Sequence, residues 1–155
     1  MTETTSKKSA PKTRGSKIKE GQKKKAAELG KAILLVQQHK AANRLEFYKP
    51  YDWQKEFYKA GTDNKQRMLM AANRVGKTAS QAAEVAYHLT GLYPDWWEGI
   101  RFTHATKIWC LGVSGEQLRD VIVKELLGTY MGDGKFDGSG LILQHLITQV
   151  TPAMG

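Results

Sequence analysis

Three adjacent residues, Gly76, Lys77 and Thr78, are of the types that hold a phosphate group and a magnesium ion. Glycine lets the backbone approach phosphate oxygens, lysine reaches the β and γ phosphates of a nucleotide, and a threonine hydroxyl is a ligand for Mg²⁺. They complete the spacing G-x-x-x-x-G-K-[ST], except that Ala71 stands at its first position. The pattern predicts binding of ATP and Mg²⁺, with the metal at Thr78. The predicted loop consists of Ala71, Ala72, Asn73, Arg74, Val75, Gly76, Lys77 and Thr78.

The residues around this loop favour phosphate binding over the alternative, a solvated turn with an exposed lysine. Residues 68–72 form a short apolar run that is typical of a buried strand. After the loop, Ala82, Val85, Ala86 and Leu89 recur at the spacing of one helix face. The loop would therefore lie at a helix N-terminus, where unpaired N–H groups and the helix dipole favour an anion.

An aromatic stretch upstream of the loop contains a candidate for adenine recognition. Gln54 precedes Lys77 by 23 residues, and its amide has the donors and the acceptor needed to pair with N6 and N7 of adenine. An aromatic ring next to it would supply a stacking face, and Tyr48, Tyr51 and Trp53 are all candidates. Taken singly, each of these aromatic residues is better explained as a core or lid residue, and their placement around Gln54 is what favours the adenine interpretation.

Three segments together resemble the N-terminal ATPase region of the large terminase subunits of tailed bacteriophages. They are YKPYDWQKEFY, LMAANRVGKTASQAAEVAYHLTGLYPDWWEG and KIWCLGVSGEQLRD, and the resemblance covers roughly residues 44–150. Its most specific parts are the alanine variant of the phosphate loop and the HLTG-x-YPDWW-x-G segment. A generic nucleotide-binding enzyme would not be expected to share the second of these.

The resemblance implies a motor that hydrolyses ATP and moves viral double-stranded DNA into a procapsid in the host cell cytoplasm. It implies a RecA-like ATPase domain followed by a nuclease domain, and a full-length protein that forms homo-oligomers. The implied partners are double-stranded DNA, the small terminase subunit and the capsid portal, with no membrane. It assigns the phosphate-loop roles to Gly76, Lys77 and Thr78, and adenine contact to Gln54. Arg74 would stabilise charge on the γ phosphate, or else make an ordinary phosphate or surface contact.

The positive charge of the chain is concentrated at its N-terminus. The net charge is +9, and residues 1–25 hold nine Lys or Arg against two Glu. This stretch has little apolar surface to bury, so we expect it to be disordered. It is either a solubilising tail or a nonspecific contact for nucleic acid phosphates. No apolar run is long enough to span a membrane, and the single cysteine, Cys110, fits a reducing compartment.

The alternation of strand, helix, strand and helix predicts an α/β fold with a parallel sheet. Together with the resemblance, it implies an incomplete RecA-like P-loop NTPase with flanking helices. Residues 26–46 are expected to form an amphipathic helix, and residues 47–155 the N-terminal part of the ATPase domain. A second strand is expected at residues 108–113, followed by a helix whose capping box is Ser114 and Gln117. Residues 128–140 are glycine-rich and expected to be a flexible connection. The Tyr93–Trp97 segment is either a stacking platform for single-stranded nucleic acid or an aromatic loop clamped on the domain.

A packaging motor also needs a carboxylate pair after an apolar strand, to hold Mg²⁺ and to orient the attacking water. Asp120 and Glu125 are the nearest candidates, but the capping box places both on a helix. We therefore expect a truncated ATPase region that binds ATP with little or no turnover. Two alternatives remain: a helicase-like P-loop motor, and a noncatalytic fragment that binds DNA or a partner and keeps a vestigial phosphate loop.

Overall fold

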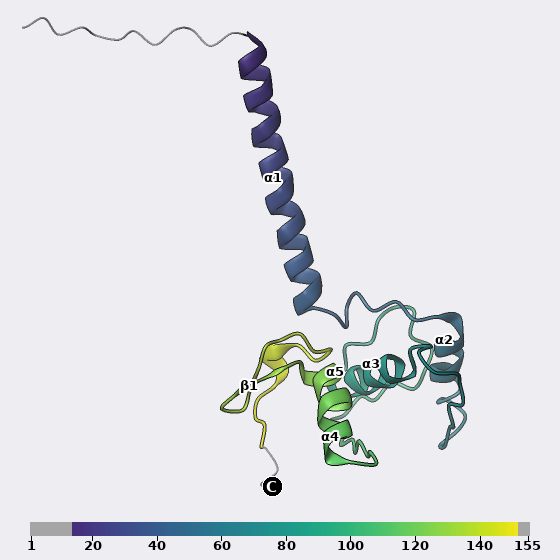
Figure 1. The fold of residues 1–155 in the computed structure, drawn as a ribbon. Helices are drawn as coiled ribbons and strands as arrows, with labels where there is room; N and C mark the ends of the chain where they lie inside the picture. The colour runs from purple at the N-terminus through teal and green to yellow at the C-terminus, as the bar shows by residue number, and fades with distance from the viewer. Residues whose placement is uncertain (1–13, 152–155) are drawn as a thin grey trace, which may run out of the picture. The chain divides into compact units, whose positions relative to one another are not determined.

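The computed structural model describes residues 14–151, with the side chains of residues 22–151. It divides the chain into two units, residues 1–38 and residues 39–155. The helices and strands follow in the order α1 (Arg14–Ala42), α2 (Asp52–Lys59), α3 (Lys77–Thr90), α4 (Gly115–Gln117), the π-helical segment η1 (Leu118–Val123), α5 (Lys124–Leu127), β1 (Tyr130–Gly132), β2 (Lys135–Phe136) and the 3₁₀ turn η2 (Gln144–Leu146) (Figure 1).

Helix α1 is longer than the helix expected at residues 26–46. It begins at Arg14, inside the stretch expected to be disordered, and ends at Ala42. Most of residues 14–25 are Lys, Arg, Gln or Glu, which are strong helix formers, and this accounts for the earlier start. Residues 1–13 of the expected tail lie outside the described residues. Leu29, Ile33 and Val36, the apolar residues at helical spacing, are exposed on α1.

Helix α3 is the element around which residues 39–151 pack, and its prediction from the apolar spacing is confirmed. It begins after Gly76, which has φ 87°, and ends at Gly91, which has φ 72°. Such left-handed backbone favours glycine, because a Cβ would be strained there. The Gly91 N–H donates to the Tyr87 carbonyl oxygen at 2.9 Å, which closes the last helical turn.

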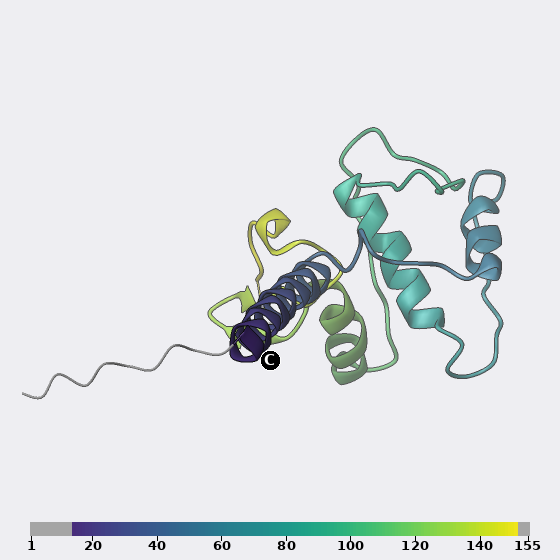
Figure 2. The ribbon, with the colours of Figure 1, turned by 90° about the horizontal axis from the view of Figure 1, so that it is seen from above.

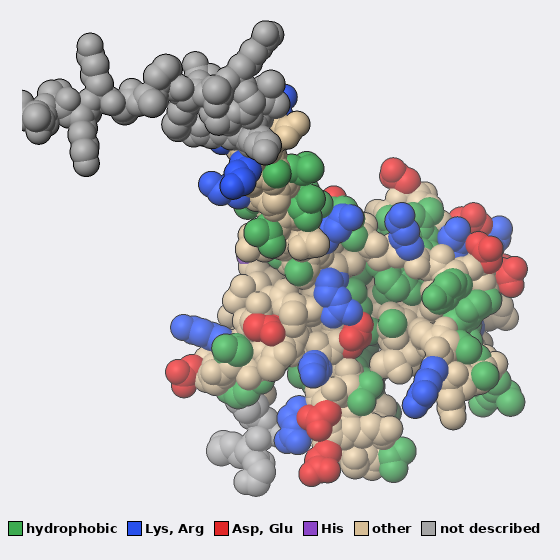
Figure 3. All heavy atoms as spheres, turned by 45° about the horizontal axis from the view of Figure 1, so that its top comes forward, with side chains coloured by type: hydrophobic (Ala, Val, Ile, Leu, Met, Phe, Trp, Pro, Cys, Tyr) green, Lys and Arg blue, Asp and Glu red, His purple; other side chains and the backbone are tan. Residues whose placement is uncertain are grey.

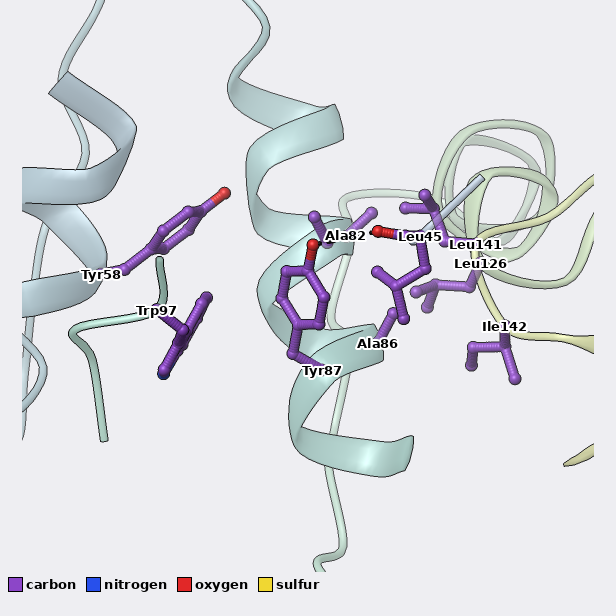
Figure 4. Close-up of a cluster of buried hydrophobic side chains, with 10 residues drawn as sticks. Leu45, Tyr58, Ala82, Ala86, Tyr87, Trp97, Leu126, Leu141 and Ile142 are labelled. Atoms are coloured by element: carbon purple, nitrogen blue, oxygen red, sulfur yellow. Dashed lines mark hydrogen bonds between the residues drawn. The ribbon is translucent and has the colours of Figure 1, made fainter. Parts of the chain in front are cut away.

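Two groups of side chains cover α3 from different directions (Figure 4). Tyr58 of α2 and Trp97 lie on one side of the helix, and their rings stack with centroids 4.8 Å apart. The apolar side chains of Leu45, Leu126, Leu141 and Ile142 lie on the other side. Between them, Ala82, Ala83 and Ala86 let the neighbouring segments approach the helix closely. The core is therefore built by small residues on one helix and large residues from five other segments.

The predicted parallel sheet is wrong. In the described part of the chain the only sheet is the antiparallel pair β1–β2, and residues 68–72 and 108–113 have no strand partner. Their alternate apolar side chains point into solvent, with exposed fractions of 81% at Met68, 86% at Trp109 and 98% at Val113. An apolar run becomes a strand only when a neighbour pairs with its backbone, and within residues 14–151 no such neighbour pairs with these two segments. The RecA-like fold class is thus not observed.

The segment after Ser114 is helical, as its capping box predicts. Ser114 Oγ accepts a hydrogen bond from the Gln117 N–H at 3.2 Å, and the helix continues through η1 and α5. The glycine-rich stretch that follows is an ordered hairpin rather than the expected flexible connection. Asp137 accepts hydrogen bonds from the Ser139 hydroxyl, the Ser139 N–H and the Thr129 N–H, and these contacts lower the pKa of its carboxyl group.

Charges of both signs are mixed on the face of the protein shown in Figure 3, with exposed apolar side chains between them. Residues 26–155 hold 15 basic and 13 acidic side chains, so the excess charge of this part is small. Within residues 14–151, no helix combines the length and the hydrophobicity needed to cross a membrane.

Candidate phosphate-binding site

The loop from Ala71 to Thr78 leads directly into the N-terminus of α3 (Figure 2). Two of its residues have left-handed backbone, Arg74 with φ 62° and Gly76 with φ 87°. For arginine this conformation is uncommon and costs free energy, so the surrounding loop must hold it in place. The two positive φ angles on either side of Val75 turn the chain sharply into the helix.

Lys77, the first residue of α3, ties the loop together. Its ammonium group donates to the carbonyl oxygens of Ala71 and Ala72, at 2.6 and 2.7 Å. These two contacts bring the first and last parts of the loop into one ring around the lysine side chain. An ammonium group has three donors, so one remains for a bound anion without loss of either carbonyl contact.

Gln54 is brought next to the loop, as the adenine hypothesis requires, but it is buried. Its exposed fraction is 2%, and its Nε2 donates to the Gly76 carbonyl oxygen at 3.3 Å. Its Oε1 accepts hydrogen bonds from the Tyr48 hydroxyl and the Tyr51 N–H, each at 2.9 Å. The side chain therefore fixes the start of α2 to the end of the loop.

A chain of hydroxyl groups continues from Gln54 into the core. The Tyr48 hydroxyl lies 3.2 Å from that of Tyr58, and Tyr58 contacts the Oγ and carbonyl oxygen of Ser80 at 2.8 and 2.9 Å. Ser80, on the first turn of α3, is fully buried. Among the residues whose side chains are described, no buried side-chain nitrogen or oxygen lacks a hydrogen-bond partner. The polar network thus joins α2 to the helix that begins at the phosphate loop.

An open pocket of about 650 Å³ lies at the loop. Its lining includes Asn73, Arg74, Gly76, Lys77 and Thr78, so the structure brings together most of the predicted loop residues. Ala71 and Ala72 contribute through their carbonyl contacts to Lys77, and Gln54 lies behind the loop without lining the pocket. The volume is within the range of small-molecule sites.

The rest of the pocket lining comes from residues that sequence reasoning did not assign to a site. They are Arg44, Ala79, Asp120, Val121, Lys124, Glu125 and Ser139. Asp120 and Glu125 lie on a helical segment, as the capping box predicts, but that segment faces the phosphate loop. The only sequence signal for this placement is the four-residue spacing between Asp120 and Lys124, which puts both side chains on one helix face.

The Tyr93–Trp97 segment lies against the core. Trp97 is 4% exposed, stacks on Tyr58 and contacts the Tyr87 ring edge-on at 5.2 Å. Its indole N–H donates to the Ile100 carbonyl oxygen at 3.1 Å. Of the two interpretations of this segment, an aromatic loop clamped on the domain agrees with the burial of Trp97, and that ring has no free face for a nucleic acid base.

The chain is 37% identical over 93 residues to the terminase large subunit of Salmonella phage P22. The match covers 52% of this chain and 19% of that protein, so the chain spans about a fifth of the length of the curated relative it matches. This similarity supports the terminase-like relationship that the motifs indicated.

The other two comparisons add no family or fold. No protein-family model matches the chain. No solved structure matches it either.

Proposed function

We propose that the pocket at the phosphate loop binds ATP with Mg²⁺, and that the chain is the nucleotide-binding part of a phage DNA-packaging ATPase. The observation that carries this proposal is the phosphate-loop sequence folded as a tight turn onto α3, with Lys77 and Thr78 at the pocket. The local similarity to a terminase large subunit supports the packaging context.

The charges around the pocket fit a polyanion. Four cationic side chains line it, against the two carboxylates of Asp120 and Glu125. The cations are Arg44, Arg74, Lys77 and Lys124. At a helix N-terminus, free N–H groups and the helix dipole add to this positive potential. A triphosphate would thus lie along the loop, with Lys77 donating to it and Arg74 able to contact the terminal phosphate.

The residues at the pocket also fit a magnesium ion. Mg²⁺ prefers oxygen ligands and usually binds through one or two protein groups together with substrate phosphates. The Thr78 hydroxyl and the Asp120 carboxylate offer such oxygens at the same pocket. No group of three or more His, Cys, Asp or Glu is placed to hold a metal within the described residues, so phosphate oxygens would complete the coordination. When bound, the ion neutralises phosphate charge.

Adenine recognition is the proposed role of Gln54 and Tyr51. Tyr51 is 65% exposed, and its ring lies 3.9 Å from the position that a Cβ on Gly76 would occupy. It is therefore the aromatic residue best placed for stacking beside the loop. Gln54 Oε1 already accepts two hydrogen bonds, one from the Tyr51 N–H and one from the Tyr48 hydroxyl. The N6 amino group of adenine would replace the Tyr48 hydroxyl as a donor to Oε1, because that hydroxyl can rotate away.

The proposed partners follow from the relative. As part of a packaging motor, the chain would act on double-stranded DNA, together with a small terminase subunit, a capsid portal and further copies of the full-length protein. The basic residues 1–25 would then contact DNA phosphates without reading sequence.

The direct test is nucleotide binding by the purified chain, measured by isothermal titration calorimetry with Mg²⁺ present. We expect ATP to bind, and Lys77→Ala to weaken binding by roughly 10- to 100-fold, the effect of losing a charge-assisted contact. Lys65→Ala, which removes an exposed lysine outside this pocket, should leave the affinity unchanged. Equal ATP affinity of the Lys77 variant and the parent chain, or no ATP binding by the parent chain, would contradict the proposal.

A further inference from the structure

Arg44 is a cationic residue outside the loop whose side chain lines the pocket. It lies in the turn after α1, far from the loop in sequence, and its side chain is 38% exposed. One terminal nitrogen donates to Glu125 Oε1 at 2.6 Å, and the other donates to the Ser139 carbonyl oxygen at 2.8 Å. Arg44, Glu125 and Ser139 all line the pocket with the phosphate loop.

The guanidinium group has donors to spare in this arrangement. Arginine carries five N–H groups, and the contacts to Glu125 and Ser139 use two of them. The group stays charged at all relevant pH values, and its planar geometry matches phosphate oxygens in pairs. It is therefore suited to bind a phosphate that enters the pocket.

The contact with Glu125 is one that a phosphate can replace. Both side chains are partly exposed, 38% for Arg44 and 27% for Glu125, and ion pairs in contact with water are weak. The terminal phosphate of a triphosphate carries more negative charge than a carboxylate. Released from Arg44, Glu125 would remain accessible to water on the first turn of α5.

We infer that Arg44 senses the terminal phosphate of a bound triphosphate: it pairs with Glu125 when the pocket is empty and with the phosphate when the pocket is filled. This inference rests on the proposed function, because it names a further contact and a regulatory role at that same pocket. Since Glu125 belongs to α5, the exchange of partners transmits the filling of the pocket to that helix.

The experiment compares ATP and ADP affinities, with Mg²⁺ present, in three variants of the full chain. Arg44→Gln should weaken ATP binding about tenfold, the typical effect of one charged hydrogen bond, and leave ADP binding unchanged. Glu125→Gln keeps Arg44 but removes its competing carboxylate, so it should strengthen binding of ATP relative to ADP. Arg119→Gln removes an exposed arginine of η1 that does not line the pocket, and should change neither affinity.

The outcomes separate this inference from the proposed function. Suppose that the parent chain binds ATP, that Lys77→Ala abolishes this binding, and that Arg44→Gln weakens the binding of ATP and of ADP equally. The sensing role is then overturned, and the proposed nucleotide site stands. An equal effect of Arg119→Gln would also overturn it, because long-range charge alone would then explain the result. No binding of ATP by the parent chain would overturn both. If Arg44→Gln does not fold, as judged by thermal melting, Glu125→Gln alone decides, and an unchanged ratio of ATP to ADP affinity overturns the inference.

Discussion

The side-chain amide of Gln54 has a structural role in addition to its proposed role in binding adenine. Its three hydrogen bonds join Tyr48, Tyr51 and Gly76, so the residue proposed to contact adenine also holds the phosphate loop against α2. A side chain that is 2% exposed can meet a ligand only after a local rearrangement. Nucleotide binding at this pocket would therefore be coupled to the packing between the loop and α2.

Replacement of Gln54 by alanine should lower both stability and nucleotide selectivity. It removes the acceptor of the Tyr51 N–H and one partner of the Tyr48 hydroxyl, whereas the Gly76 carbonyl keeps the Ser80 N–H as a donor. The free energy of unfolding should therefore fall by about 1 to 3 kcal/mol. The preference for ATP over GTP should fall as well, because the amide that distinguishes the two bases is gone. Denaturant unfolding and calorimetry measure the two effects.

The control is Gln81→Ala, which removes an exposed amide on α3 and should change neither quantity. An unchanged preference for ATP over GTP in the Gln54 variant would remove its adenine role. If the free energy of unfolding nevertheless falls, Gln54 serves only to hold the phosphate loop against α2.

Single residues close in sequence were easier to predict than residues that meet only in the fold. The loop from Ala71 to Thr78 follows from one local pattern, and the spacing of Gln54 from Lys77 predicted their proximity. Arg44, Asp120 and Glu125 reach the same pocket from segments on both sides of the loop in sequence. No local pattern records such contacts, because they depend on how α3 and α5 pack.

At the scale of elements, the helices predicted after the phosphate loop and after Ser114 are observed, whereas the strands predicted at residues 68–72 and 108–113 are not. A helix such as α3 satisfies its hydrogen bonds within its own residues, so the apolar spacing and Gly91 were enough to define it. Residues 68–72 and 108–113 have strand-like composition, but a strand depends on a partner elsewhere. Without that partner, the same residues have no regular secondary structure and are partly exposed.

Within the Tyr93–Trp97 segment, the Trp97 side chain should contribute strongly to the stability of the fold. Trp97→Ala removes the ring that stacks on Tyr58 and contacts Tyr87, so we expect a loss of about 3 to 5 kcal/mol in the free energy of unfolding. Trp109 is the matched control, because its side chain is 86% exposed. Trp109→Ala should change the free energy by no more than about 0.5 kcal/mol.

Denaturant unfolding of the two tryptophan variants provides the measurement, with helical circular dichroism as the signal. Similar losses in both variants would show that Trp109 is also packed in solution. A loss confined to Trp109→Ala would contradict the arrangement of the core around α3.

At the scale of the whole molecule, the densest run of basic residues and the hydrophobic core lie in different parts of the sequence. Residues 1–25 hold nine of the 24 basic residues, whereas the core consists of residues between Leu45 and Ile142. The sequence predicted this division from composition alone. It did not predict that helix would extend back to Arg14, because a low apolar content argues against packing but not against a helix in lysine-rich sequence.

The buried tyrosines of the core have a consequence for the protein in alkaline solution. Burial raises the pKa of Tyr58 and Tyr87 above the usual tyrosine value of 10. Above pH 10 the unfolded chain releases these phenolic protons and the folded chain keeps them, so the free energy of unfolding falls as the pH rises. Phenolate absorbance from these residues should therefore appear together with the loss of helical circular dichroism. In Tyr58→Phe the increase in phenolate absorbance at that transition should be smaller, because one buried tyrosine is missing. If both tyrosines instead ionise at a pH well below that at which the helix is lost, water reaches the hydroxyl network beside the phosphate loop in the folded protein.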